Sequence, residues 1–557
     1  MRYLISLSIL VLASLTFTSC NDDFLTRPPL DEMSDETYWT SEENVQTFAW
    51  DFYPAYFNAY GSGFTWGRYF AGETLNDDFA PSEPTDFVEN VPTSGGGWTF
   101  AWVRKANLMI DRVEGMDMGE GAINHWVGIG RFFRALEYND LAKRFGGVPW
   151  YDEVLEEDED DRLYKERDDI TTVVDNMLAD FDFAAENVRI EDGTPGLTVN
   201  RDVVLAFMSR VFLYHGTYFK YHDIDQERAE TYLQASRDAA NELIESGRYS
   251  LGDDYRSLFN SMDLSGNPEM ILYRKYEEGT LMHSLNTYSN QEAQSGGSKS
   301  AIDSYLMDNG LPIRQNGSGY QGDEGIDNVM ADRDPRITET FVQELRINGE
   351  VSNYSTSGYS QHKFLNEDIA DQNIGVSNQN PTDGPVIRYG EVLVNYAEAS
   401  YEMNDQISQA DLDKSINVLR SRNGVDMPDL IVGGQIDDPE RDSDVAPLLW
   451  EIRRERRVEL MMEGFRLDDL KRWEKLEKTD TEDNDDINLG AWIDLSEHPE
   501  ANVDIEGGGN EGFILPAAEA ASQRRFNDDR VYLYPLPLDQ IQLYEDNGVN
   551  LQQNPGW

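Results

Sequence analysis

Arginine and glutamate crowd the stretch Ile452-Arg453-Arg454-Glu455-Arg456-Arg457-Val458-Glu459-Leu460, which continues through Glu463-Gly464-Phe465-Arg466 to Asp468-Asp469-Leu470-Lys471-Arg472-Trp473. In a helix, Glu455, Glu459 and Glu463 share one face at steps of four residues, within reach of the arginines between them. Surrounding cations lower the pKa of a carboxylate, whereas a catalytic acid needs a raised pKa. We therefore expect a structural and largely buried ionic network that includes Glu455, Arg456, Glu459 and Arg466.

Apolar residues recur at helical spacing on both sides of this stretch. Upstream, they predict helices over 102–113, 129–145, 168–187, 204–218 and 229–244. Downstream, helices are expected over 387–403, 409–422 and 445–478. Small residues such as Ala206 and Ala239 stand where paired helices approach closely, which suggests hairpins of the tetratricopeptide kind. The usual repeat pattern of that kind, with a period of about 34 residues, is not cleanly present.

Residues 248–385 differ in composition from the rest of the chain. Gly, Asn, Ser, Asp and Tyr dominate there, in clusters such as Gln294-Ser295-Gly296-Gly297. Loops and short strands fit this composition better than long helices do. We therefore divide the mature chain into an N-terminal helical region (20–247), a loop-rich variable lobe (248–385) and a C-terminal region (386–557) that completes the helical scaffold.

The first residues carry the pattern of a lipoprotein signal peptide. Met1-Arg2-Tyr3 precedes an apolar stretch from Leu4 to Phe17, and Thr18-Ser19-Cys20 follows. We expect residues 1–19 to be removed and Cys20, the only Cys of the chain, to carry the acyl chains. The following Asn21-Asp22-Asp23 resembles the export signal that sends Bacteroidetes lipoproteins to the cell surface.

The charge balance excludes several classes of partner. Among 557 residues, 105 Asp and Glu stand against 46 Lys and Arg, which gives a formal net charge of −59. Such a surface repels the phosphates of nucleic acids and the headgroups of anionic lipids. Any attachment to a membrane must therefore be covalent or through another protein. Hydrophobic residues make up 39% of the chain, enough for a folded core.

The titratable residues form no pattern typical of an enzyme or of a cofactor site. The six His residues lack zinc spacing, and there is no phosphate-binding loop or nucleophile elbow. Glycosidases need only two carboxylates, so Asp77-Asp78, Glu277-Glu278 and Asp468-Asp469 are candidates, but such pairs occur by chance in so acidic a chain. We expect no catalysis, no cofactor and no metal site, although the acidic loop Asp480–Asn488 leaves calcium open.

Four stretches together resemble the SusD/RagB family of Bacteroidetes outer-membrane nutrient-binding lipoproteins. They are Cys20-Asn21-Asp22-Asp23-Phe24-Leu25 with Ser34-Asp35-Glu36-Thr37-Tyr38-Trp39, Arg131-Phe132-Phe133-Arg134-Ala135-Leu136 through Phe145-Gly146-Gly147-Val148-Pro149, Arg388-Tyr389-Gly390-Glu391 through Ala399 with the Arg/Glu stretch, and Pro535-Leu536-Pro537 with Gln553-Asn554-Pro555-Gly556. The resemblance implies a mainly α, SusD-like fold of four tetratricopeptide-like helical hairpins with a loop-rich α/β lobe. It also implies surface exposure at the outer membrane, a lid-like complex with a SusC-like TonB-dependent transporter, and no catalysis.

The leading interpretation is a surface protein that captures oligosaccharides and passes them to its transporter. Three alternatives stay open. The chain could be a peptide-binding, RagB-like member of the same family. It could instead be a secreted glycoside hydrolase, or a scaffold that stabilises the transporter and contacts no solute.

Candidate ligand contacts follow from the chemistry of sugars, whose C–H faces stack on aromatic rings and whose hydroxyls pair with Asn, Asp and Arg. Loops that combine such residues over a rigid scaffold are therefore favoured. Two segments qualify, Gly63–Asp78 and Tyr273–Tyr288, and the family's glycan contacts generally come from loops in these two regions. We expect Trp66, Tyr69, Tyr276 and Tyr288 as stacking platforms, and Arg68, Asn76 and Asp78 as hydroxyl partners.

Overall fold

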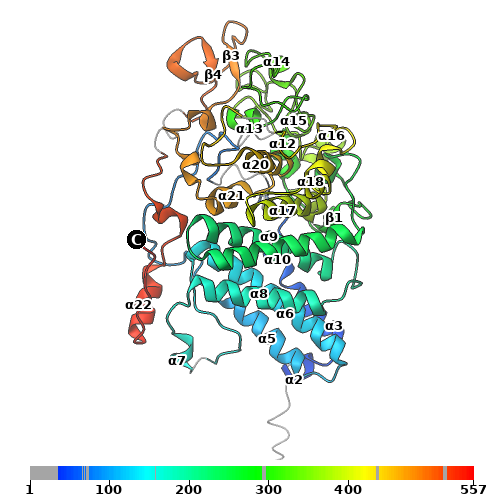
Figure 1. Ribbon diagram of the computed structural model, residues 1–557, viewed down its shortest axis with the longest axis vertical. Coiled ribbons are helices and arrows are strands. Elements are labelled where there is room, and N and C mark those ends of the chain that lie inside the picture. The colour runs from blue at the N-terminus through cyan, green and yellow to red at the C-terminus, as the bar shows by residue number, and fades with distance from the viewer. Residues whose placement is uncertain are drawn as a thin grey trace, which may run out of the picture.

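The computed structural model describes residues 35–65, 67, 69, 75–156, 159–290, 296–434, 438–517 and 524–557. The expected lipidation site Cys20 and two expected ligand contacts, Trp66 and Arg68, lie outside the described residues. Helices dominate the described part, and its strands are few and short. In Figure 1 long helices fill the lower part of the molecule, and short helices, loops and small sheets fill the upper part.

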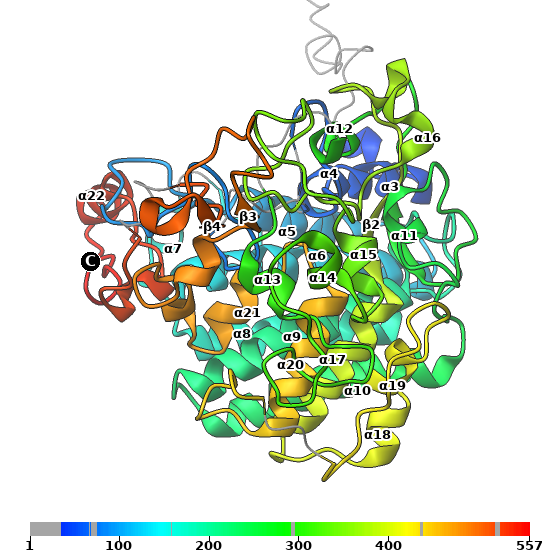
Figure 2. The same cartoon turned by 90° about the horizontal axis from the view of Figure 1, so that it is seen from above.

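Long helices form the scaffold: α5 (Ala101–Glu114), α6 (Glu120–Phe145), α8 (Ile170–Asn187), α9 (Arg201–Tyr221), α10 (Gln226–Ser246), α17 (Tyr389–Glu402) and α20 (Pro447–Glu459). Shorter ones are α2 (Asp35–Tyr38), α3 (Glu42–Trp50), α4 (Tyr53–Tyr56), α7 (Asp160–Leu163), α18 (Gln409–Asp413), α19 (Ile416–Arg420), α21 (Arg466–Arg472) and α22 (Leu538–Asp546). The long helices pack in sequence order, α5 on α6, α6 on α8, α9 on α10 and α10 on α17 (Figures 1 and 2). The mainly α class is confirmed, and the pairwise packing fits the expected hairpins.

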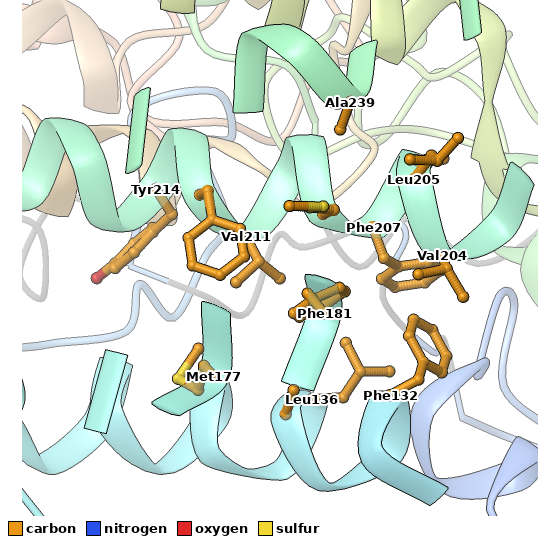
Figure 3. Packing of buried hydrophobic residues seen from close by; sticks show 14 of the residues in the cluster. Phe132, Leu136, Met177, Phe181, Val204, Leu205, Phe207, Val211, Tyr214 and Ala239 are labelled. Atoms are coloured by element: carbon orange, nitrogen blue, oxygen red, sulfur yellow. The ribbon is translucent and has the colours of Figure 1, made fainter. Parts of the chain in front are cut away.

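Local sequence signals explain where these helices begin and end. Asn200 caps α9 by accepting a hydrogen bond from the Val203 N–H, and Asp225 caps α10 in the same way through the Arg228 N–H. Gly247 ends α10 in the left-handed conformation, with φ of 62°. Figure 3 shows the apolar faces that result: Phe132 and Leu136 from α6 lie opposite Phe207 and Val211 from α9, and all four are buried.

The lobe is built of short elements: α11 (Ser257–Asn260), β1 (Met270–Arg274), α12 (Leu285–Asn290), α13 (Lys299–Asp303), α14 (Ile326–Met330), α15 (Arg336–Thr340), α16 (Glu367–Ala370) and β2 (Gly384–Arg388). A second small sheet joins β3 (Trp492–Asp494) to β4 (Glu511–Phe513). β1 and β2 pair antiparallel, with Tyr273 opposite Pro385. Because β2 crosses the boundary expected between residues 385 and 386, lobe and scaffold share a sheet. The division into regions stays a prediction.

Three downstream helices differ from the expected ranges. The segment 387–403 begins as the end of β2, so that α17 starts only at Tyr389. The segment 409–422 is broken into α18 and α19, and 445–478 into α20 and α21. The second break has a clear cause: Met462 and Gly464 adopt left-handed backbone, with φ of 65° and 78°. This turn brings Glu463 back toward α20, although it no longer lies on the helical face of Glu459.

A buried ionic cluster, called here the Glu459 cluster, joins the lobe to the scaffold. It consists of Glu269, Asp334, Arg336, Lys363, Arg388, Arg420, Arg422, Glu455, Glu459 and Glu463, all buried. Arg336 donates to Glu455 (2.6 Å) and Glu459 (3.0 Å), and Arg422 donates to Glu459 (2.8 Å). Arg336 comes from the lobe, whereas Glu455 and Glu459 lie on α20, so that the ion pairs cross between the two parts.

The expected network is confirmed for Glu455 and Glu459, but its expected partners are wrong. Arg456 instead pairs with Asp469 (2.9 Å), and Arg466 with Asp77 (2.6 Å). One helical residue rotates the side chain by about 100°, so Arg456 leaves α20 on a different side from Glu455 and Glu459. Glu455 and Glu459 therefore form their ion pairs with arginines from α15, β2 and α19.

Within the residues that the structure describes, no helix combines the length and apolar character that a bilayer crossing requires.

Candidate functional site

The loop Gly61–Thr65 is fixed to the lobe by hydrogen bonds from its neighbours. Tyr276 Oη donates to the Gly61 carbonyl (2.8 Å), and Ser284 Oγ donates to the Gly63 carbonyl (2.6 Å). The Gly63 N–H in turn donates to the Met282 carbonyl (2.8 Å). Because Tyr276 and Ser284 are almost fully buried, these bonds are shielded from water and hold the loop in one conformation.

Phe64 stands at the tip of this loop with 66% of its surface exposed. Its backbone carbonyl accepts a hydrogen bond from Tyr288 Oη at 3.3 Å. The ring is therefore exposed to solvent while the backbone is held in place. Gly67 closes the loop with φ of 60°, and a Cβ there would lie 1.9 Å from the Ala59 carbonyl oxygen, so only glycine fits. An open aromatic ring on a fixed loop is the arrangement that sugar stacking requires.

The structure brings Tyr69, Tyr276 and Tyr288 together, but their rings are buried. Tyr276 is 2% exposed and Tyr69 is 5% exposed, and both pack against Tyr60. Their hydroxyls bond to backbone carbonyls, Tyr69 to Pro385 at 2.6 Å. We expected these rings to offer open stacking faces, and this is corrected here: the rings belong to a hydrophobic core beneath the loop. A direct contact with ligand stays a prediction.

Asn76 and Asp78 are also buried and support their own loop. Asn76 Oδ1 accepts from the Asp78 N–H (2.9 Å), and Asp78 accepts from Arg457 Nε (2.9 Å). Burial raises the pKa of Asp78, and Arg457 opposes this effect. Asp77 binds Arg466 through both carboxylate oxygens, so the Asp77-Asp78 pair neutralises arginines of the C-terminal region. Contacts between Asn76 or Asp78 and a ligand likewise stay a prediction.

A cavity of about 520 Å³, called here the scaffold–lobe cavity, is lined by Ala59 and Tyr69, which flank the loop Gly61–Thr65 in sequence. Its wall combines helices α4, α6 and α9 with residues 385–386 and 464–471. Tyr56, Tyr69, Phe207 and Tyr534 line it together with the basic residues Lys143, Arg144, Arg210 and Lys471. Its acidic lining residues are Asp140 and Asp468. The described lining is thus more basic than acidic, in contrast to the chain as a whole.

A larger cleft of about 760 Å³ lies between α13, α20, α21 and residues 483–489. Cations and carboxylates pair along its wall, for example Lys478 with Asp442 (2.7 Å) and Arg314 with Asp303 (3.0 Å). Arg453 lies 4.3 Å from the centre of the Trp473 ring, and Lys478 lies 5.6 Å from that of Trp450. Many of the charges in this cleft are therefore already paired with one another.

No group of three or more His, Cys, Asp or Glu side chains among the described residues could hold a metal ion. The other acidic pair at a cavity, Asp468-Asp469, is bound by Lys143 (2.7 Å) and Arg456 (2.9 Å).

Phe64 is not among the aromatic residues that the sequence singled out, and the contacts expected of those residues with a ligand stay a prediction. Phe64 lies in the same segment as Trp66, and only its exposure distinguishes it from ring-bearing neighbours such as Tyr69. Burial of that kind depends on long-range packing and leaves no local signal. Lys471 lies 328 residues after Lys143 in sequence, so it meets Lys143 and Arg144 only in the folded chain.

Comparisons with known proteins agree with this architecture. The sequence profile of the SusD family matches residues 257–557, more than half of the chain. A SusD-like protein of Formosa agariphila is 24% identical over 501 residues, which cover 85% of this chain and 92% of that protein. These matches include the C-terminal half, in which the Glu459 cluster has most of its residues.

Solved structures share the fold. A SusD-like carbohydrate-binding protein from Bacteroides fragilis superposes with a TM-score of 0.67 at 20% identity, covering 93% of this chain and 100% of that one. A second SusD-like protein of Bacteroides fragilis gives 0.68 at 22% identity, with 95% and 100% covered. A laminarin-binding SusD-like protein gives 0.55 at 19% identity, with 93% and 99% covered. The chain belongs to the SusD family.

Proposed function

We propose that the protein captures oligosaccharides at the cell surface and passes them to a SusC-like TonB-dependent transporter. The observation that carries this proposal is the exposed Phe64 ring on a loop that buried hydrogen bonds hold in place. Membership of the SusD family supports it, since solved relatives are described as carbohydrate-binding and laminarin-binding proteins. The expected acylation of Cys20 would anchor the chain at the outer membrane.

The proposed contact surface is centred on Phe64. Trp66 and Arg68 lie two and four residues after it in sequence and are proposed as further contacts, as an aromatic face and a hydroxyl partner. Tyr276 and Tyr288 support the loop from beneath through their hydroxyl groups. Asn378 is a further polar neighbour, because its N–H donates to the same Ser284 Oγ that holds Gly63 (2.7 Å). Binding without catalysis is proposed, since the acidic pairs at the cavities are neutralised by arginine and lysine.

The test is a direct titration of the mature chain, without its lipid anchor and its transporter. Neutral and acidic oligosaccharides and unrelated peptides are compared by calorimetry, and reducing ends are followed over time in parallel. We expect saturable binding of an oligosaccharide with no increase in reducing ends. Binding of peptides alone would favour the RagB-like alternative, and release of reducing ends would identify a hydrolase.

A further inference from the structure

Lys471 is a buried ammonium group without a carboxylate partner among the described residues. The residue is 7% exposed, and the one hydrogen bond from its ammonium group to the described residues runs from Nζ to the Lys143 carbonyl at 3.3 Å. It forms no ion pair with any described residue. A buried charge is costly unless it is paired, and an ammonium can donate three hydrogen bonds. The Lys471 ammonium can therefore donate further hydrogen bonds, and it lines the scaffold–lobe cavity.

Two further cations stand beside it. The Arg144 guanidinium lies 4.7 Å from the centre of the Tyr534 ring, and Lys471 Nζ lies 5.4 Å from the same point. Arg144 is exposed and forms no ion pair within the described part of the chain. Lys143 pairs with Asp468 (2.7 Å) and lies over the Tyr214 ring at 4.3 Å. Asp468 is thus engaged by Lys143, and the described lining holds four cations against the two carboxylates of Asp140 and Asp468.

The chain's own architecture produces this arrangement. Lys143 and Arg144 occupy the last turn of α6, where cations favour the helix dipole, and Lys471 comes from the last turn of α21. The Tyr534 N–H donates to the Arg144 carbonyl (2.7 Å), which brings the tyrosine ring onto the cations. Burial lowers the pKa of Lys471 to about 8; Asp468 opposes this shift, and Lys143 and Arg144 add to it. A bound anion would relieve this repulsion.

We propose that the scaffold–lobe cavity binds an anionic group carried by a sugar, a carboxylate or a sulfate ester, through Lys471, Arg144 and Lys143. Its volume of about 520 Å³ lies within the range of small-ligand sites, roughly 300–1,000 Å³. The Tyr56 and Tyr534 rings in the wall supply apolar surface for the sugar, and Asn58 and Asn139 supply amides for hydroxyls. This inference rests on the proposed function, since it names the class of oligosaccharide.

Variants test the site. Lys471→Met removes the buried charge at similar volume, and Arg144→Gln removes an exposed charge without disturbing the core. Lys414→Met is the matched control, because it removes the same charge from a lysine bonded to Asn241 outside the cavity. The probes are a galacturonate oligosaccharide, a neutral galactose oligosaccharide of equal length, and inorganic sulfate, all at constant ionic strength with chloride.

We expect the acidic probe to bind more tightly than the neutral one, and Lys471→Met and Arg144→Gln each to weaken it by about tenfold or more. Lys414→Met should bind like wild type. Sulfate should slow reductive methylation of Lys471 but not of Lys414, a measurement on wild type that does not depend on any variant. Equal affinity for acidic and neutral probes, together with unchanged methylation, would overturn this inference and leave the proposed function standing. Sulfate protection of Lys471 without binding of either oligosaccharide would support the anion site and count against the proposed function.

Discussion

Arg388 holds Glu459 by two bonds, one to its side chain and one to its backbone. Nη1 donates to Glu459 Oε1 at 2.7 Å, and Nη2 donates to the Glu459 carbonyl at 2.8 Å. Arg388 ends the strand that pairs with the lobe, whereas Glu459 ends α20 of the scaffold. Both residues are at most 1% exposed, so this pair fixes the angle between the two parts without help from solvent. The Arg/Glu stretch therefore has a structural role at the junction of lobe and scaffold.

Neutralising Glu459 should strongly destabilise the protein. Glu459→Gln keeps the shape of the side chain but leaves Arg336, Arg388 and Arg422 with too little negative charge, which typically costs about 3–5 kcal/mol. Chemical denaturation measures the loss. Glu114→Gln, at the exposed end of α5, is the control for the change in net charge. A Glu459→Gln protein that unfolds at the wild-type denaturant concentration would contradict the role given to this cluster.

The pH dependence of that loss follows from the pKa of Glu459. Burial alone would raise it, but Arg422, Arg388 and Arg336 lower it from 4.5 to about 2. A lowered pKa contributes stability that is complete above the unfolded value of 4.5 and disappears as the pH falls through about 2. The difference in free energy of unfolding between wild type and Glu459→Gln should therefore shrink below about pH 4.5. Denaturation series between about pH 6 and pH 3 measure it, and a constant difference would argue against the assigned pKa.

Support of the Phe64 loop can be removed without touching the loop itself. Ser284→Ala deletes the bonds to the Gly63 carbonyl and from the Asn378 N–H, which should loosen the loop and weaken oligosaccharide binding severalfold. Ser289→Ala is the matched control, because it removes a buried hydroxyl from α12, the helix that begins just after Ser284, and this hydroxyl donates to the Leu285 carbonyl. Hydrogen exchange of residues 61–65 and calorimetry are the measurements. Unchanged exchange and affinity in Ser284→Ala would mean that the loop needs no such support.

Membrane attachment should depend on Cys20. Cys20→Ala removes the thiol that carries the acyl chains, and we expect the protein to leave the outer-membrane fraction. Fractionation and surface labelling in cells that lack the transporter are the measurements. Recovery of the variant in the outer membrane with normal labelling would show another means of attachment. Replacement of Asp22 and Asp23, with lipidation intact, tests the export signal separately.

Much of the scaffold could be predicted because its helices carry local signals. The sequence shows apolar stripes, such as that of Val204, Phe207 and Val211, and capping residues such as Asn200. The breaks were missed because left-handed Met462 depends on tertiary packing, which overrides the helical preference of its neighbours. Ion-pair partners were missed for a related reason, since Arg336 and Glu455 lie 119 residues apart and meet only in the folded chain.

The candidate site was harder to predict than the fold. Aromatic and polar residues led us to expect a ligand site in this loop. The sequence alone does not show whether a ring such as Tyr276 faces solvent or is buried in a core. In the structure Tyr276 and Tyr288 support the backbone on which Phe64 is displayed. The basic lining of the scaffold–lobe cavity could not be foreseen from a composition with a net charge of −59.

Titration of Phe64→Ala with the oligosaccharide that wild type binds tests the account most directly. Phe64→Tyr keeps the ring, and Trp50→Ala removes an aromatic side chain that is 47% exposed at the end of α3, outside the loop. We expect unchanged melting for all three variants, binding weakened roughly tenfold in Phe64→Ala, and near wild-type binding in the other two. Wild-type affinity in a stably folded Phe64→Ala protein would contradict the proposed site.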